Sequence, residues 1–258
     1  MSAARPVLAS TANPLIKKIL KLHDKKGRIA AGAFLLEGRR EFDLALKHNI
    51  EILQIFCLSE KIADLPECSA EKVIVAPKVL AKISYRGETE GFVAVAKTPQ
   101  YKLDNFQLPE KPLLLITDAL EKPGNVGAVL RTADAAGITA VLICDNDDLY
   151  NPNLIRASLG AIFTLPVFTL TSAAALQWLK KNKIKIAVAS PEARQPHWQY
   201  DWSGAQAIVI GSEADGLSDI WQENADDTLL IPMSGEVDSL NASVSAAVLM
   251  YEAKRQRG

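Results

Sequence analysis

Apolar residues recur along the chain in two different rhythms, which divide it into two regions. The first region opens with a helical stretch from residue 13 to about residue 26, whose apolar residues are spaced to bury one face. Short β-branched or apolar runs then alternate with short helical ones. The expected strands are 33–36, 52–58, 72–75 and 92–96, and the later helices are 39–47 and 77–83. This pattern predicts a small α/β domain.

The second region alternates strands and helices regularly. Its strands are expected at 113–117, 140–144, 185–190, 207–210 and 228–231, and its helices at 125–136, 152–159, 172–181 and 240–255. Because these strands are almost wholly apolar, they predict a parallel sheet that is covered by helices on both faces.

A stretch with three prolines and no sustained pattern separates the two regions, at residues 98–112. We therefore expect one domain over residues 1–98, a linker over 99–112 and a second domain over 113–258.

Bulk composition narrows the class of protein. Apolar residues make up 48% of the chain and charged residues 23%, which suits a folded core with a polar surface. No apolar run approaches the roughly 18–20 residues that span a bilayer, and residues 1–12 lack the apolar segment of a secretory signal. We expect a cytoplasmic protein with no membrane partner. Cys57, Cys68 and Cys144 are far apart and no CxxC occurs, so we expect reduced thiols and no metal site.

Charge is distributed unevenly along the chain. The net charge is −1, but residues 1–50 carry +6 and the remaining residues carry −7. A basic end on an acidic body is typical of a module that binds an anionic partner such as RNA. A solvated helix face rich in lysine would give the same pattern, and charge alone leaves both interpretations open.

Three segments rich in Gly, Asn, Ser and acids follow strands of the second region, where parallel α/β domains bind ligands. They are residues 118–134, 208–218 and 230–243. The first contains neither GxGxxG nor the P-loop GxxxxGK[ST], so a dinucleotide-dependent oxidoreductase or a kinase loses its usual support. Asn125 stands where a helix N-cap is expected, and Arg131 could pair with a carboxylate or hold a phosphate. In the third segment, Ser239 or Asn241 could cap the last helix.

Together these segments resemble the three motifs of the SpoU branch of the SPOUT RNA methyltransferases. The family pattern is N-x-G-x-x-x-R-T-A-D, then G-S-E-x-x-G-L, then I-P-M-x-G-x-x-x-S-L-N. The chain keeps Asn125, Gly127 and Arg131–Asp134 of the first, Gly211–Glu213, Gly216 and Leu217 of the second, and Ile231–Met233, Gly235 and Ser239–Asn241 of the third. Ala214 departs from the glycine that members often have. The likeness covers about residues 112–256.

The resemblance implies a fold and partners. The second domain would be an α/β-knot, in which a parallel sheet is threaded into a trefoil knot, and members are usually homodimers through this domain. Ser10, Asn13–Lys17 and Phe34–Arg40 resemble the family's substrate-binding domain, a small α/β RNA-binding domain. Ribosomal RNA is favoured over transfer RNA as the substrate, because the additional N-terminal domain is typical of such members.

The resemblance also implies an activity, which is transfer of a methyl group from S-adenosylmethionine to a ribose 2′-hydroxyl. It assigns the cofactor to Gly211, Ile231 and Leu240. It assigns catalysis to Arg131, supported by Asn125, Glu213, Ser239 and Asn241.

Arginine is unsuitable as a general base, because a guanidinium essentially never gives up its proton. We therefore expect Arg131 to hold the phosphate of the nucleotide and to stabilise negative charge on the attacking oxygen. Phosphate, water or Glu213 would take the proton. The alternative is a protein that binds RNA without transferring a methyl group. Loss of Asn125, Arg131 or Asn241 would have favoured it, but all three are present.

Overall fold

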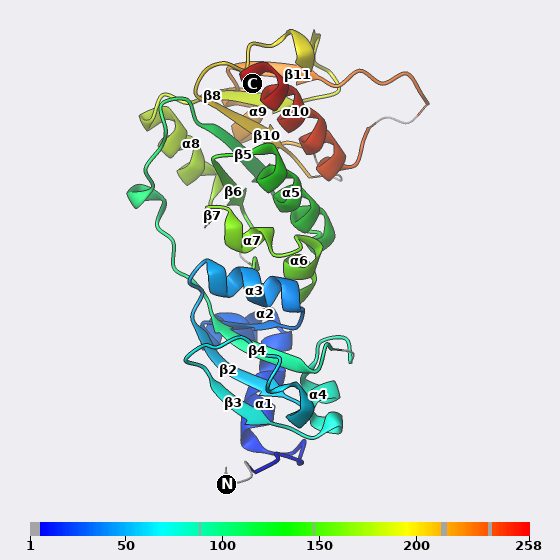
Figure 1. Cartoon of the computed structure of the whole chain (residues 1–258). Coiled ribbons are helices and arrows are strands. Elements are labelled where there is room, and N and C mark those ends of the chain that lie inside the picture. The colour runs from blue at the N-terminus through cyan, green and yellow to red at the C-terminus, as the bar shows by residue number, and fades with distance from the viewer. Residues whose placement is uncertain (1–5, 88, 147, 213–215, 237–238) are drawn as a thin grey trace. The chain divides into compact units, whose positions relative to one another are not determined.

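A computed structural model describes residues 6–87, 89–146, 148–212, 216–236 and 239–258 (Figure 1). The chain forms two compact units. The first comprises the chain up to Gln100 together with Asp148–Phe163, and the second comprises Tyr101–Asp147 and Thr164–Gly258. Residues 148–163, which the sequence placed in the second domain, thus belong to the first compact unit.

The first unit is built on a four-stranded sheet in the order β1-β4-β2-β3. These strands are β1 (Ala33–Leu36), β2 (Ile52–Cys57), β3 (Glu71–Ile74) and β4 (Phe92–Lys97). Strand β4 is antiparallel to β1 and β2, whereas β2 and β3 are parallel. The helices are α1 (Pro14–Leu20), α2 (Lys25–Ala31), α3 (Arg39–Lys47), α4 (Pro77–Ile83), α6 (Pro152–Ala157) and α7 (Ala161–Thr164). Apolar residues of α1, α4 and the sheet form one buried cluster, as the spacing of apolar residues predicted.

The prediction of one helix over residues 13–26 is wrong. Helix α1 ends at Leu20, a short 3-10 turn follows, and the backbone of Asp24 is extended with φ −99° and ψ 144°. Helix α2 then folds back so closely that a Cβ atom on Gly27 would lie 1.8 Å from the carbonyl oxygen of Lys21. The break is stabilised by the buried Arg28, whose Nη1 donates to two carbonyls of the preceding turn.

Residues 148–163 pack into this unit through an ion pair, aromatic contacts and hydrogen bonds of Asn153 with Arg86 and Tyr85. Arg28 donates to both carboxylate oxygens of Asp148, with the shortest contact at 2.6 Å. The rings of Tyr150 and Phe163 stack on Phe34, with centroids 4.6 Å and 6.0 Å away. These contacts explain why a segment far along the chain clusters with the first hundred residues.

The second unit is a seven-stranded sheet in the order β7-β6-β5-β10-β8-β11-β9, and every neighbouring pair is parallel. The strands are β5 (Leu113–Asp118), β6 (Ala140–Cys144), β7 (Val167–Leu170), β8 (Lys185–Ala189), β9 (Gln195–Pro196), β10 (Gln206–Ile210) and β11 (Asp227–Leu230). The predicted parallel α/β sheet is confirmed. Strands β7 and β9 were not predicted, and β9 has only two residues.

Helices cover both faces of this sheet. Helices α8 (Ser172–Lys181) and α9 (Asp219–Asn224) bury Trp178, Leu179 and Trp221 against one face. Helices α5 (Pro123–Ala136) and α10 (Ala242–Arg257) pack against each other on the opposite face (Figure 1). Part of the expected linker also belongs to this unit, because Leu103, Phe106 and Leu108 pack against the same cluster as Trp221. The predicted knot and domain limits stay predictions.

Candidate active site

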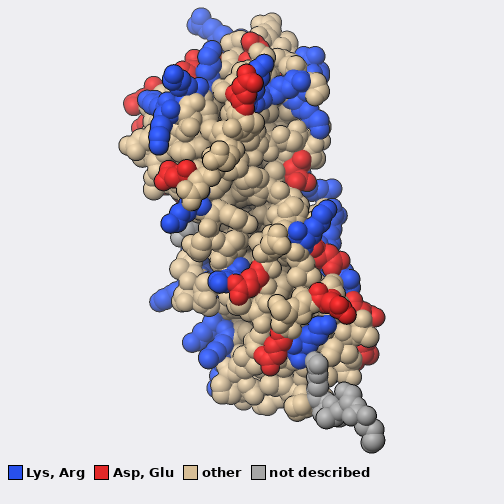
Figure 2. Space-filling model, turned by 60° about the vertical axis from the view of Figure 1, so that its left-hand side comes forward, with Lys and Arg blue, Asp and Glu red and all other residues tan. Residues whose placement is uncertain are grey.

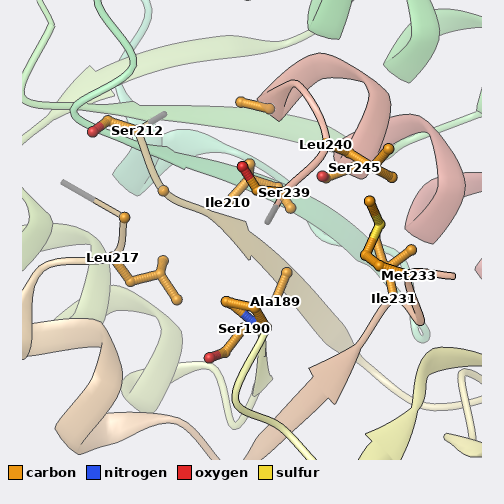
Figure 3. Close-up of a pocket in the computed structure, with 14 residues that line it drawn as sticks. Ala189, Ser190, Ile210, Ser212, Leu217, Ile231, Met233, Ser239, Leu240 and Ser245 are labelled. Carbon is orange, nitrogen blue, oxygen red and sulfur yellow. The ribbon is translucent and has the colours of Figure 1, made fainter. Parts of the chain in front are cut away.

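A cleft opens at the carboxyl ends of strands β8, β10 and β11, which are adjacent in the sheet (Figure 3). Its volume is about 210 Å³. The residues that line it are Ala189, Ser190 and Pro191 at the end of β8 and after it; Ile210, Gly211, Ser212, Gly216 and Leu217 at the end of β10 and after it; Ile231, Met233, Ser239 and Leu240 after β11; and Ala242 and Ser245 of α10. The second and third sequence motifs therefore form opposite parts of one cavity.

The structure divides the predicted site residues into two groups. Gly211, Ile231, Ser239 and Leu240 all line the cleft. Asn125, Arg131 and Asn241 are outside its lining, and Glu213 lies outside the described residues. The residues that were expected to bind the cofactor thus surround one cavity, whereas most of those expected to act in catalysis lie elsewhere on α5 and at the start of α10.

The second motif forms a closed turn. Ser212 N–H donates to the carbonyl of Gly216 at 2.9 Å, and Gly216 N–H donates back at 3.1 Å. Gly211 enters this turn so closely that a Cβ atom on it would lie 2.2 Å from the Gly216 oxygen and 2.6 Å from the Leu217 nitrogen. Gly216 itself has φ +70°, which favours glycine. Two glycines are therefore needed for the turn to bring its backbone to the cleft.

Gly211→Ala should open this turn, because the new methyl group would overlap backbone atoms that cannot move aside independently. We expect the affinity for a ligand of the cleft to fall at least about tenfold, as a 1 Å misplacement in a binding site can cost more than that. Calorimetry with S-adenosylmethionine would measure the loss. Gly124→Ala is the matched control, since a Cβ atom there meets nothing within 4 Å, and unchanged affinity in Gly211→Ala would refute the assignment.

The first and third motifs meet at a pair of asparagines. Asn241 caps α10, because its Oδ1 accepts a hydrogen bond from Ser243 N–H at 3.0 Å. Its Nδ2 donates to Oδ1 of Asn125 at 3.4 Å. The predicted cap at the start of α10 is confirmed. The predicted cap role of Asn125 is wrong, because Pro123 starts α5 two residues earlier and leaves Lys122 at the cap position.

Arg131 lies in the third turn of α5 and is exposed. Its guanidinium makes no hydrogen bond or ion pair with any residue that the structure describes. Its neighbours in the motif stabilise the helix instead: Thr132 donates to the carbonyl of Ala128, and Asp134 accepts from Thr164 at 2.6 Å. Arg131 is thus an available cation on the helix that the two asparagines join to α10.

Sequence reasoning missed several residues of the site. Ala189 ends β8, and Ser190 and Pro191 follow it. Only the strand order reveals that β8 lies between β10 and β11. Asp118, at the end of β5, is 2% exposed and accepts a hydrogen bond from Ser218 N–H. Its position at a strand's carboxyl end was the signal that could have identified it.

Thiol chemistry at Cys144 and metal chemistry have no support within the described residues. Burial raises the pKa of the Cys144 thiol, at the end of β6, to about 12, so the thiol stays protonated. Among the residues with described positions, no group of His, Cys, Asp and Glu could hold a metal ion. In that same part of the chain, every helix is too short or too polar to cross a membrane.

Two family models match the chain. The SpoU rRNA Methylase family model matches residues 112–251, which is more than half of the chain. The chain belongs to the SpoU rRNA methylase family. The model of the MRM3-like substrate binding domain matches residues 13–94. Both matches confirm the predicted family, and with it the predicted class of enzyme.

Relatives of this SpoU chain align over nearly its whole length. A 23S rRNA (guanosine(2553)-2′-O)-methyltransferase of Bacillus subtilis is 29% identical, over 95% of this chain and 97% of the relative. The crystal structure of an RNA 2′-O ribose methyltransferase is 38% identical with a TM-score of 0.85, covering 98% of this chain and 99% of the other. The SpoU methyltransferase AviRb from Streptomyces viridochromogenes, in complex with S-adenosylmethionine, is 27% identical with a TM-score of 0.87, covering 95% and 98%.

Proposed function

We propose that this chain transfers a methyl group from S-adenosylmethionine to a ribose 2′-hydroxyl of ribosomal RNA. The observation that carries the proposal is the meeting of three family motifs: two line one cleft, and the Asn125–Asn241 hydrogen bond joins the remaining one to them. Relatives named as RNA 2′-O-methyltransferases support the reaction, and one named for 23S ribosomal RNA supports the substrate. Ribosomal RNA as the substrate favours a cytoplasmic location.

The cleft suits S-adenosylmethionine in shape and chemistry. Apolar side chains of Ile210, Leu217, Ile231 and Leu240 provide walls for a flat adenine ring. Gly211 lines the cleft and has no side chain, so its main-chain groups can bind the polar edge of the ring. When bound, the cofactor supplies an activated methyl group and a neutral leaving group.

The protein would then position the ribose and stabilise its oxygen. We assign this role to Arg131, whose guanidinium can hold the phosphate of the target nucleotide and stabilise charge on the attacking 2′-oxygen. Asn241, through its bond to Asn125, would fix α5 relative to the cleft wall at Leu240. Neither role requires a protein group to act as a strong base.

The test of the proposed function is ribose methylation of RNA. Ribosomal RNA lacking the modification should gain one 2′-O-methyl group when incubated with the purified chain and S-adenosylmethionine, at a position found by mapping. Transfer RNA should remain unmodified. Absence of methylation in both RNAs, with cofactor binding intact, would contradict the reaction.

The first unit carries exposed lysines that suit an RNA backbone. Lys17, Lys18, Lys21, Lys25 and Lys26 all lie on α1, α2 or the turn between them, and all are exposed. On the face drawn in Figure 2, basic side chains are interspersed with acidic ones. We therefore attribute RNA binding to the local lysine cluster rather than to a continuous basic face.

Reversing three of these charges should weaken RNA binding. The triple variant Lys17→Glu, Lys18→Glu, Lys21→Glu should lose on the order of tenfold or more in affinity at low salt, and its salt dependence should become shallower. Fluorescence anisotropy with a ribosomal RNA fragment measures both. The matched control reverses Lys180, Lys181 and Lys183, which are exposed in the second unit. Equal losses in the two triple variants would contradict a specific role for α1 and α2.

The last helix presents an apolar stripe that suits a second copy of the chain. Val244 is 45% exposed and Tyr251 is 49% exposed. The two residues are about two turns apart on the same face of α10. We propose that this stripe forms the homodimer interface. Light scattering should give the mass of a dimer, and Val244→Lys with Tyr251→Lys should give a monomer. A wild-type chain that stays monomeric at every concentration would contradict this.

A further inference from the structure

A buried carboxylate lies behind the cleft without lining it. Asp118 is the last residue of β5 and is 2% exposed. Its Oδ2 accepts a hydrogen bond from Ser218 N–H at 2.7 Å, and its Oδ1 lies 3.1 Å from Ser172 Oγ. Burying a carboxylate costs free energy unless hydrogen bonds compensate for the lost water. Ser218 and Ser172 provide such bonds to Asp118.

The bond to Ser218 holds the exit of the turn that forms one wall of the cleft. Gly216 and Leu217, immediately before Ser218, both line the cleft. The entrance of the turn is closed by the paired hydrogen bonds between Ser212 and Gly216. The exit has its own tether to the sheet, which is Asp118.

The same residue begins the loop that leads to the first motif. Ala119 has φ +50°, and its N–H donates to the carbonyl of Cys144 at 3.2 Å. The carbonyl of Leu120 accepts from Asn146 Nδ2 at 2.9 Å. Helix α5, which carries Asn125 and Arg131, starts three residues later. Asp118 therefore links the loop before the catalytic helix to the turn of the cofactor cleft.

We propose that Asp118 is a positioning residue for methyl transfer. Through Ser218 it holds the cleft residues Gly216 and Leu217 against the cofactor, and it touches neither the cofactor nor the RNA. This inference rests on the proposed function, because it takes the cleft to be the cofactor site.

The surroundings of Ser172 predict which substitutions Asp118 tolerates. Ser172 Oγ lies 2.7 Å from Asp145 Oδ2 as well as near Asp118, and it accepts a hydrogen bond from Trp221 Nε1 at 3.3 Å. One hydroxyl carries one proton, so it donates to only one carboxylate at a time. An asparagine at 118 could accept from Ser218 through its oxygen and donate to Ser172 through its nitrogen. A leucine could do neither.

Three variants test the tether. Asp118→Leu removes the acceptor, and Ser218→Pro removes the N–H donor at a residue whose φ of −67° already suits proline. Both should raise the Kd for S-adenosylmethionine on the order of tenfold to a hundredfold, the loss expected for a buried hydrogen bond to a charged group. Asp118→Asn should restore binding to near the wild-type Kd. At saturating cofactor, kcat should stay close to the wild-type value in all three variants.

The matched control is Asp226→Leu. Asp226 Oδ2 also accepts from a backbone N–H, that of Ile186 at 2.8 Å, but at the amino end of β8, away from the cleft. This variant should lose stability and keep its Kd. A wild-type Kd in the folded Asp118→Leu and Ser218→Pro variants would overturn the proposal. If Asp118→Leu does not fold, the comparison of Ser218→Pro with Asp118→Asn still tests it. A wild-type chain that binds no S-adenosylmethionine, or a Leu240→Glu variant with unchanged affinity, would instead contradict the proposed function.

Discussion

Arg131→Ala should lower the rate of methyl transfer on the order of a hundredfold to a thousandfold and leave the affinity for S-adenosylmethionine unchanged. The expected loss is that of one well-placed donor aimed at developing negative charge. Cofactor affinity should persist because Arg131 is outside the lining of the cleft. Its side chain makes no hydrogen bond or ion pair with the described residues, so the substitution should not change the fold.

Single-turnover methylation of ribosomal RNA, beside calorimetry with the cofactor, separates the two effects. Arg131→Lys should recover part of the rate, since a lysine keeps the charge but loses the planar fork that matches a phosphate. The control is Arg255→Ala, which removes an exposed arginine from α10 that pairs with Glu252. A near wild-type rate in Arg131→Ala would show that this arginine is only a surface residue of α5.

Asp148→Ala should destabilise the chain by about 3 kcal/mol, the loss expected when one partner of a buried ion pair is removed. Arg28 is 4% exposed and makes its shortest contact to Asp148 at 2.6 Å. Without the carboxylate, the carbonyls of Leu22 and His23 would be the remaining partners of the guanidinium among the residues that the structure describes. The packing of residues 148–163 in the first unit should loosen with it.

Urea unfolding followed by circular dichroism measures this loss. The control is Asp43→Ala, which breaks an exposed pair with Arg39 and should cost about 0.5 kcal/mol or less. The double variant Arg28→Met, Asp148→Leu should regain much of the stability, because it leaves no charge buried. Equal losses for Asp148→Ala and Asp43→Ala would mean that the pair contributes no more than a surface contact.

Helices and strands with a strong local pattern were predictable to within a few residues. Helices 39–47, 77–83 and 172–181 and strands 33–36 and 140–144 coincide with those observed. Failures occurred where local pattern and tertiary contacts disagree. The first helix breaks at Asp24 because the buried Arg28 stabilises a turn there, and the periodicity of residues 13–26 contains no sign of that contact.

The candidate site shows the same division. Gly211, Ile231, Ser239 and Leu240 could be named from the motifs, because the residues that shape a turn or open a helix are consecutive in the chain. The walls contributed by Ala189 and Ser190 could not, since they depend on β8 lying between β10 and β11. Motif spacing also does not show that α5, which carries Arg131, lies next to the start of α10.

Residue order was sufficient to recognise the family from its three motifs, because each motif is a consecutive stretch that can be matched without the fold. The resemblance then implied the reaction and the roles of the motif residues. The arrangement of those motifs required the folded chain. The Asn125–Asn241 bond joins residues 116 positions apart, and the Asp118–Ser218 bond joins residues 100 positions apart. Such pairs form only when the strand order β5-β10-β8-β11 brings the carboxyl ends of distant strands to one edge. That order is set by packing of the whole sheet, which no local pattern encodes.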